Sequence, residues 1–372
     1  METCLFVENG DTLKALQSFL RKLLETGFVE ALLVPMRTPG GTVIPALVTS
    51  PECLSASDPL APVFPGNGAA LASKLSSREP RAKVGAVLRA CELRALVELS
   101  KMQQASLDDL ILIAIDCAGT YRVPVFQKKG IGDMGQVVEL WRELYRAVAE
   151  QPETPLQDLR AACKICEQPV YDGALISIKL LGSDTNQSIS VSLPDELGEQ
   201  LGLNVIKPPD ERARMLERLV AARAAQRESE FAAIRARLEG DEGLAGVMAA
   251  CIRCHNCMTV CPICYCKTCV FRSAIFDHEP MQYVNWARQK GAYRLPADTL
   301  LFHLTRLNHM VLSCVGCGMC TEACPADLPV GLVFRAIGER LQATFDYFPG
   351  RSLDDPLPLV NFKADEWTEV GE

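Results

Sequence analysis

The chain has 372 residues, of which 48% are apolar and 23% charged, which is enough apolar surface for two folded domains and too much for a disordered chain. Its net charge of −8 argues against nucleic-acid binding, because proteins that bind phosphate backbones are usually basic. The longest apolar run, Leu110–Ile115, is far too short to span a bilayer, and the first residues lack the basic stretch that begins a secretory signal. We therefore expect a cytoplasmic protein with no membrane span.

Helix and strand patterns alternate over the first 125 residues. The predicted elements are, in chain order, a helix over 13–24, strands over 28–34 and 42–48, a strand over 83–88, a helix over 92–104 and a strand over 110–115. The last strand is continuously apolar, as in a sheet that is covered on both faces. This order of elements is typical of an α/β domain with a partly parallel sheet.

The composition changes near residue 209. Residues 210–239 are rich in Ala, Arg, Glu and Leu and contain no proline, which predicts a long solvated helix or helix pair that acts as a connector. An α-rich, cysteine-rich region follows, and the end of the chain is expected to be extended. The predicted parts are an α/β domain over 1–208, a helical connector over 209–245, a cysteine-rich domain over 246–345 and a tail over 346–372.

Seventeen cysteines are the most informative feature of the composition. In a long chain without a secretory signal, clustered cysteines indicate ligands for a soft metal or catalytic thiols rather than disulfides. Two segments share one pattern, Cys251-x2-Cys254-x2-Cys257-x3-Cys261-Pro262 and Cys314-x2-Cys317-x2-Cys320-x3-Cys324-Pro325. This is the run found in bacterial ferredoxins with two 4Fe-4S clusters.

The spacing predicts which thiolates share a cluster. Three cysteines on one loop bind three irons of one cube, and the fourth, after a turn, reaches the other cube. The predicted ligands of the first cluster, here cluster A, are Cys251, Cys254, Cys257 and Cys324. Those of the second, cluster B, are Cys314, Cys317, Cys320 and Cys261. Two zinc sites are the alternative, but zinc sites normally show two separated cysteine pairs rather than four cysteines in each run.

A long insertion, residues 262–313, separates the two runs and contains three more cysteines, Cys264, Cys266 and Cys269. These could be extra ligands, redox thiols or small buried hydrophobic side chains, and we assign them to no site. His255 lies inside the first run. Rieske ligation needs two histidines at a different spacing, so His255 is expected to be at most a hydrogen-bond donor near the cluster.

Four further cysteines lie in the α/β part. Cys91 and Cys117 each follow a predicted strand, and in a parallel pair of strands both would lie at the carboxyl edge of the sheet, where open α/β sheets bind ligands. Cys163 and Cys166 form a Cys-x2-Cys pair. A thioredoxin-like redox site is one interpretation of that pair, although it does not open a helix within a βαβ unit.

The segment Gly130-Ile131-Gly132-Asp133-Met134-Gly135 has the form G-x-G-x-x-G and precedes a predicted helix over 137–148. A dinucleotide fingerprint requires a buried strand directly before it. Lys128 and Lys129 stand at that place instead. We therefore interpret the segment as a loop before a helix and not as a nucleotide site.

Several segments carry a resemblance to a known family. They are Leu24-Glu25-Thr26-Gly27-Phe28-Val29-Glu30-Ala31, Arg89-Ala90-Cys91-Glu92-Leu93-Arg94-Ala95-Leu96, Ile115-Asp116-Cys117-Ala118-Gly119-Thr120-Tyr121, and Cys163-Lys164-Ile165-Cys166 running into Gly173-Ala174-Leu175-Ile176-Ser177. Over residues 1 to about 190 the chain resembles the β-subunit family of coenzyme F-420 hydrogenases and dehydrogenases. The ferredoxin-like part is similar to that of the formate dehydrogenase β-subunit branch.

The resemblance implies an FAD-binding α/β domain with its own 4Fe-4S cluster, coupled to a two-cluster ferredoxin domain. In that family the flavin exchanges a hydride with the deazaflavin coenzyme and passes single electrons to the clusters. Because hydride carriers move two electrons and clusters move one, a flavin is needed between them. The predicted ligands of this third cluster are Cys91, Cys117, Cys163 and Cys166, and the alternative is four unrelated buried thiols.

By matching position, the resemblance also implies flavin contacts at Thr49, Asn67, Lys83 and Glu92. Turn or solvated surface residues are the alternative for each of them. No G-x-G-x-x-G is required, because this family does not hold FAD with that fingerprint.

The predicted function is that of an oxidoreductase subunit that passes electrons between FAD and 4Fe-4S clusters. Its expected partner is the catalytic subunit of a formate dehydrogenase or hydrogenase, or a heterodisulfide reductase type module, since no molybdenum or nickel ligand motif is present. Coenzyme F-420, a nicotinamide or ferredoxin is the expected soluble carrier. The alternatives are an electron-transfer subunit that holds clusters without flavin and a cluster-containing regulator, against which the acidic composition argues.

Overall fold

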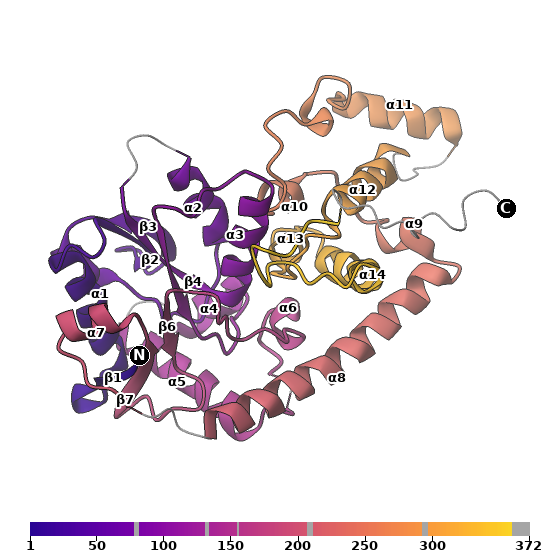
Figure 1. Cartoon of the computed structure of the whole chain (residues 1–372). Coiled ribbons are helices and arrows are strands. Elements are labelled where there is room, and N and C mark those ends of the chain that lie inside the picture. Colours follow the sequence, from indigo (N-terminus) through magenta and orange to yellow (C-terminus); the bar gives the residue numbers. More distant parts are fainter. Residues whose placement is uncertain (78–81, 131–133, 155, 207–210, 292–296, 359–372) are drawn as a thin grey trace. The chain divides into compact units, whose positions relative to one another are not determined.

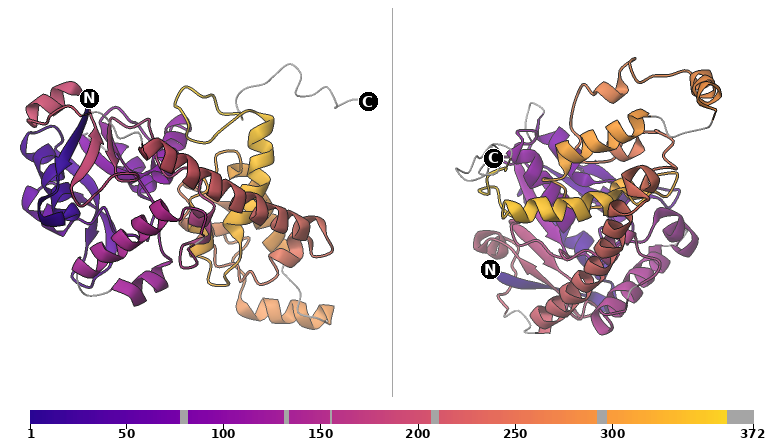
Figure 2. Two further views of the ribbon diagram at one scale, coloured as in Figure 1. Left: turned by 90° about the horizontal axis from the view of Figure 1, so that it is seen from below. Right: turned by 90° about the vertical axis from the view of Figure 1, so that its right-hand side faces the viewer.

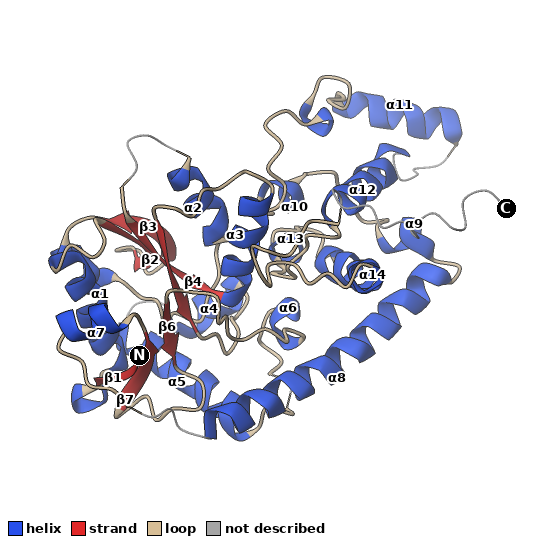
Figure 3. Cartoon of the chain, in the orientation of Figure 1, coloured by secondary structure: helices blue, strands red, loops and turns tan. Residues whose placement is uncertain are grey.

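The computed structural model describes residues 1–77, 82–130, 134–154, 156–206, 211–291 and 297–358 (Figure 1). It divides into two compact units. The first comprises Met1–Glu228, Val315–Cys317 and Gly350–Asp355, and the second Ser229–Cys314, Gly318–Pro349 and Pro356–Glu372. Strands occur in the first unit, whereas the described part of the second consists of helices and loops (Figure 3).

A mixed seven-stranded sheet forms the centre of the first unit, in the order β1-β7-β6-β5-β4-β2-β3. The strands are β1 (Glu2–Phe6), β2 (Ala31–Arg37), β3 (Val43–Val48), β4 (Val84–Arg89), β5 (Leu110–Ile115), β6 (Ile176–Lys179) and β7 (Ser188–Ser192). Strands β2, β4, β5 and β6 are mutually parallel, while β3 and β7 pair antiparallel with their neighbours. The partly parallel sheet that the sequence predicts is therefore confirmed.

Helices surround this sheet. They are α1 (Thr12–Glu25), α2 (Gly68–Ser76), α3 (Ala90–Lys101), α4 (Val123–Gly130), α5 (Met134–Glu150), α6 (Ala161–Lys164) and α7 (Asp195–Gln200), with short 3-10 turns η1 (Glu8–Gly10) and η2 (Pro51–Ala56). The predicted helix over 92–104 begins two residues earlier, at Ala90. The reason is that the Glu92 carboxylate accepts a hydrogen bond from the Arg89 amide (2.9 Å), which makes Arg89 the cap and puts Cys91 in the first turn.

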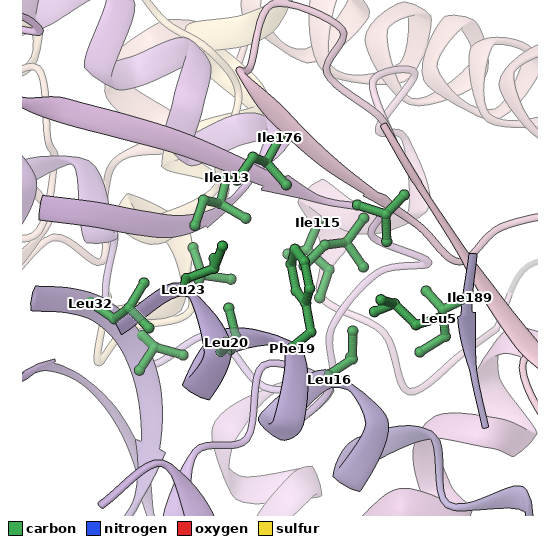
Figure 4. Packing of buried hydrophobic residues seen from close by; sticks show 14 of the residues in the cluster. Leu5, Leu16, Phe19, Leu20, Leu23, Leu32, Ile113, Ile115, Ile176 and Ile189 are labelled. Carbon is green, nitrogen blue, oxygen red and sulfur yellow. The ribbon is translucent and has the colours of Figure 1, made fainter. Parts of the chain in front are cut away.

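The main core lies between α1 and one face of the sheet. Leu16, Phe19, Leu20 and Leu23 recur at helical spacing, and all four side chains are buried (Figure 4). They pack against alternate residues of the strands, among them Ile113 and Ile115 of β5 in Figure 4. Alternation is required because successive strand side chains point to opposite faces. This packing fixes the register of the sheet and so the position of every strand end.

The long helix predicted for 210–239 is α8 (Glu211–Glu239), which Figure 2 shows as one continuous helix from two directions. The later helices are α9 (Gly243–Val247), α10 (Asn256–Thr259), η3 (Val270–Arg272), α11 (Pro280–Lys290), α12 (Ala297–Met310), α13 (Met319–Glu322) and α14 (Val330–Thr344). Among the described residues, no helix combines the length and apolar composition that crossing a membrane requires.

Several predictions include residues outside the described ranges. These residues are 131–133 of the glycine-rich segment, the predicted boundary at 208–209, the first residue of the helix predicted for 210–239, residues 292–296 of the insertion and residues 359–372 of the tail. Lys128 and Lys129, just before the glycine-rich segment, form the last turn of α4.

Candidate iron–sulfur and cofactor sites

Two cysteines lie at the carboxyl edge of the parallel sheet, as their positions after two strands predict. β4 and β5 are parallel neighbours, with Arg89 opposite Ile115 at their ends. Cys91 follows in the first turn of α3, and Cys117 follows β5 after one residue. The register of the sheet therefore places the two thiols at adjacent strand ends.

The Cys-x2-Cys pair lies at the same edge. Burial raises the pKa of the Cys117 thiol to about 11, and the nearby thiols of Cys163 and Cys166 contribute to that rise. Burial also raises the pKa of Cys91, to which the thiols of Cys117 and Cys166 contribute in turn. The hydroxyl of Thr120 is 3.4 Å from the Cys163 sulfur. Three separate segments thus bring together the four cysteines predicted to hold the third cluster.

A buried carboxylate fixes the loop that carries Cys117. Asp116 Oδ2 accepts hydrogen bonds from the amides of Leu180 (2.8 Å) and Leu181 (2.9 Å), and Oδ1 accepts one from Arg212 Nη2 (3.0 Å). Arg223 of α8 donates a hydrogen bond to the Cys166 carbonyl (3.3 Å). Sequence reasoning assigned no role to these charged groups, although an Asp immediately before a ligand cysteine at a strand end was an available signal.

Replacing Asp116 by Ala should destabilise the first unit strongly. The change would leave two buried amides without their acceptor and would remove the carboxylate partner of Arg212, which would keep only the Leu181 carbonyl. Breaking a buried charged pair costs about 3–5 kcal/mol of unfolding free energy. Hydrogen exchange of peptides from β5 and β6 measures the loss locally. The exposed Glu153, paired with Arg218, is the matched control, and equal protection in both alanine variants would contradict the assignment.

In the second unit, the first three cysteines of the first ferredoxin-like run lie near one another and near Cys324. Burial raises the pKa of the Cys257 thiol to about 11. Three nearby thiols add to that shift, and they belong to Cys251, Cys254 and Cys324. Thiols influence one another only when they lie close together. The structure therefore brings together the four predicted ligands of cluster A.

Two side chains of α12 contact these sulfurs and were missed in the sequence. Arg306, 3% exposed, donates from Nη1 to Cys257 Sγ (3.1 Å) and from Nη2 to the Cys257 carbonyl (3.0 Å). His303 Nε2 lies 3.4 Å from Cys251 Sγ, and burial followed by the charge of Arg306 lowers its pKa to about 4. Their spacing of three residues, which puts both on one helix face, was the available signal.

The second run is divided between the two units. In the second unit, the thiols of Cys261 and Cys320 both help to raise the pKa of Arg306. Gly331 lies against the same sulfur, since a Cβ at this position would be 3.3 Å from Cys320 Sγ. Cys317 groups with the first unit, where its carbonyl accepts a hydrogen bond from Arg160 Nη2 (3.0 Å). There its thiol contributes to the raised pKa of Cys91.

The other cysteines and histidine of the insertion region have mixed surroundings. Cys264 is half-buried, Cys266 is exposed, and Cys269 Sγ lies 3.6 Å from the sulfur of Met258. The ring of His255 stacks on Phe302 with centroids 4.6 Å apart. Within the described part of the chain, no three Cys, His, Asp or Glu side chains are placed to hold one metal ion.

Two of the predicted flavin contacts lie at the carboxyl end of β4. Asn67 caps α2, with its Oδ1 accepting from the Ala69 amide (3.0 Å), and its buried Nδ2 has no partner among the described residues. Glu92 is buried and accepts from the amides of Gly68 (2.7 Å) and Arg89. Glu92 therefore holds the loop that presents Asn67.

The other two predicted flavin contacts lie at the opposite end of the sheet. Lys83 precedes β4, and its ammonium is 4.5 Å from the centroid of the Phe28 ring. Thr49 follows β3 and is exposed. The six residues of β4 separate the two ends by about 17 Å. The structure thus places the four residues as two pairs and does not bring them into one site.

The comparisons with known proteins first define the class of the cysteine-rich part. Residues 247–328 match the 4Fe-4S dicluster domain family. The match covers both ferredoxin-like runs, residues 251–261 and 314–324.

Over more of the chain, the relatives are β subunits of formate dehydrogenases. The chain is 26% identical to the F420-dependent formate dehydrogenase subunit beta of Methanocaldococcus jannaschii, covering 74% of this chain and 75% of the relative. It is 25% identical to the F420-dependent formate dehydrogenase 1 subunit beta of Methanococcus maripaludis, covering 95% and 94%. A chain of the F420-reducing [NiFe] hydrogenase complex from Methanosarcina barkeri matches with a TM-score of 0.46 and 12% identity, covering 65% of this chain and 94% of that chain. The predicted resemblance is confirmed.

Proposed function

We propose that the chain is an iron–sulfur flavoprotein subunit that transfers electrons between FAD and 4Fe-4S clusters. The observation that carries this proposal is the convergence of Cys91, Cys117, Cys163 and Cys166 at the carboxyl edge of the sheet. A 4Fe-4S cluster at this edge would lie where open α/β sheets bind their cofactors. The match to the 4Fe-4S dicluster domain family over residues 247–328 supports two further clusters.

FAD would supply the exchange between two-electron and one-electron transfer. Asn67 is the residue best placed to contact it, because a buried amide nitrogen without a partner among the described residues favours a bound acceptor. Glu92 would act by holding the Asn67 loop. Thr49 and Lys83 remain predictions for a separate part of the cofactor.

The relatives' names support the choice of partner. We infer a complex with a formate dehydrogenase catalytic subunit, with a hydrogenase or a heterodisulfide reductase type module as alternatives. Coenzyme F-420 is the soluble carrier that those names favour over a nicotinamide or ferredoxin.

Cofactor analysis of the anaerobically purified full chain tests the proposal. We expect about twelve irons per chain, as three cubes require, together with FAD that is released on denaturation. A full complement of iron without FAD would instead establish the flavin-free electron-transfer subunit.

Replacing Arg306 by Met should lower the reduction potential of cluster A. A hydrogen bond from a charged donor stabilises the more negative, reduced cluster, and a bond of about 1.5–3 kcal/mol corresponds to about 60–130 mV for one electron. A redox titration followed by electron paramagnetic resonance measures the shift. Arg237→Met, at an exposed arginine paired with Glu242, is the control, and equal potentials in the two variants would exclude the role.

A further inference from the structure

A pocket of about 640 Å³ lies in the first unit, away from Asn67 and Glu92. Its walls are one face of α5, the first turns of α8 and the loop that follows β6, and Figure 1 labels the three elements. The volume is that of a site for a small organic cofactor. No predicted flavin contact lines this pocket.

Each of the two helices presents a pair of arginines to the pocket. Arg142 and Arg146 of α5 face the pocket, as do Arg214 and Arg218 of α8, four residues apart on each helix. The acidic lining residues are Asp184 and Glu211. The lining thus presents four guanidinium groups and two carboxylates.

Two of the arginines are already engaged and two are not. Arg142 donates to the Gly10 carbonyl and pairs with Glu139 (3.4 Å), and Arg218 pairs with Glu153 (3.1 Å).

Arg146 and Arg214 are exposed and make no hydrogen bond or ion pair within the described residues. The buried hydroxyl oxygen of Ser183, in the same lining, also has no partner there. A pair of uncommitted guanidinium groups beside an uncommitted hydroxyl is a donor set for phosphate oxygens.

The pocket adjoins the predicted third cluster. Tyr145, in its wall, donates its hydroxyl hydrogen bond to the Asp116 carbonyl (2.7 Å), and Asp116 directly precedes Cys117. The lining residues Leu180 and Leu181 donate their amides to the Asp116 carboxylate. A ligand bound in the pocket would therefore contact residues that hold Asp116, which directly precedes the predicted cluster ligand Cys117.

We propose that this pocket binds the phosphate groups of a nucleotide-like redox cofactor, with Arg146 and Arg214 as the main contacts. The redox part of this inference rests on the proposed function, whereas the anion site rests on the pocket alone. The phosphates could belong to FAD or to coenzyme F-420, and their chemistry at the pocket is shared.

The test uses the full chain, freed of any co-purified flavin for the binding measurement, and ADP, a probe that carries a diphosphate but no redox ring. The pocket variant is the double substitution Arg146→Gln with Arg214→Gln, and Arg237→Gln on the exposed part of α8 is the control. We expect calorimetry to show ADP binding to the wild type and to the control, and at least about tenfold weaker binding to the pocket variant, since each charge-assisted bond is strong. Iron content verifies that the variants are folded.

Flavin content then distinguishes the sources. Loss of co-purifying FAD in the pocket variant assigns the site to FAD, while unchanged FAD with weaker binding of coenzyme F-420 assigns it to the soluble carrier. Either supports the anion site. The inference is overturned if ADP does not bind the wild type or binds all three proteins equally. A wild type without FAD would contradict the proposed function but leave the ADP result interpretable.

Discussion

A Cys163→Ser variant is expected to contain about eight irons per chain instead of about twelve, because one of three cubes loses a ligand. The reason is the placement of Cys163 beside Cys117 at the sheet edge, where the Cys163 thiol contributes to the raised pKa of Cys117. A serine hydroxyl is a poor ligand for an iron that prefers thiolate. Iron analysis and the reduced-cluster signal of anaerobically reconstituted protein measure the change.

Two other cysteines of the first unit provide the control. Cys53 is exposed and Cys4 lies in β1, and neither is among the converging thiols. Serine at either position should leave the iron content unchanged. Wild-type protein that stops at about eight irons, with Cys163→Ser indistinguishable from it, would show that the four cysteines are ordinary buried thiols.

The second expected result concerns the dicluster domain. Cys257→Ser should remove cluster A and Cys320→Ser should remove cluster B, each lowering iron by about four per chain and leaving FAD in place. Cys257 lies among the other predicted cluster A ligands, and Arg306 contacts its sulfur. Spectroscopy of the reduced variants measures which cluster signal disappears.

Cys266, exposed in the insertion, is the matched comparison. Its replacement by Ser should leave both cluster signals intact, since the insertion cysteines are assigned to no cluster. Unchanged iron in Cys257→Ser and Cys320→Ser would refute the ligand assignment. A cluster lost in Cys266→Ser would show that the insertion contributes a ligand.

The sequence predicts β2, β3, β4 and β5 well because their signal is local. β5 has the predicted bounds, Leu110–Ile115, since a continuously apolar run between polar turns has one natural strand register. β6 and β7 were not predicted, because each is short and is held by its neighbours in the sheet rather than by its own pattern. β1 pairs with β7, far along the chain, and depends on the same non-local contacts.

The same distinction applies to the sites. Ligand cysteines are found from fixed spacing within one loop, but the groups that hold them come from distant segments. Arg306 reaches Cys257 across 49 residues, and Arg212 reaches Asp116 across 96. The predicted flavin residues show the opposite case, because their positions in the sequence did not indicate how far apart Asn67 and Lys83 lie in space. Only the register of β4 reveals that they lie at opposite ends of the strand.

Asp116 joins the two proposed sites, since it precedes Cys117 and its carboxylate accepts hydrogen bonds from the amides of Leu180 and Leu181 in the pocket wall. Such a connection implies thermodynamic linkage. If ligand binding in the pocket changes the stability of the reduced third cluster, reduction of that cluster must change ligand affinity by the same factor. A tenfold change in affinity corresponds to a shift of about 59 mV for one electron. The oxidation state of this cluster would then regulate whether the ligand is bound or released.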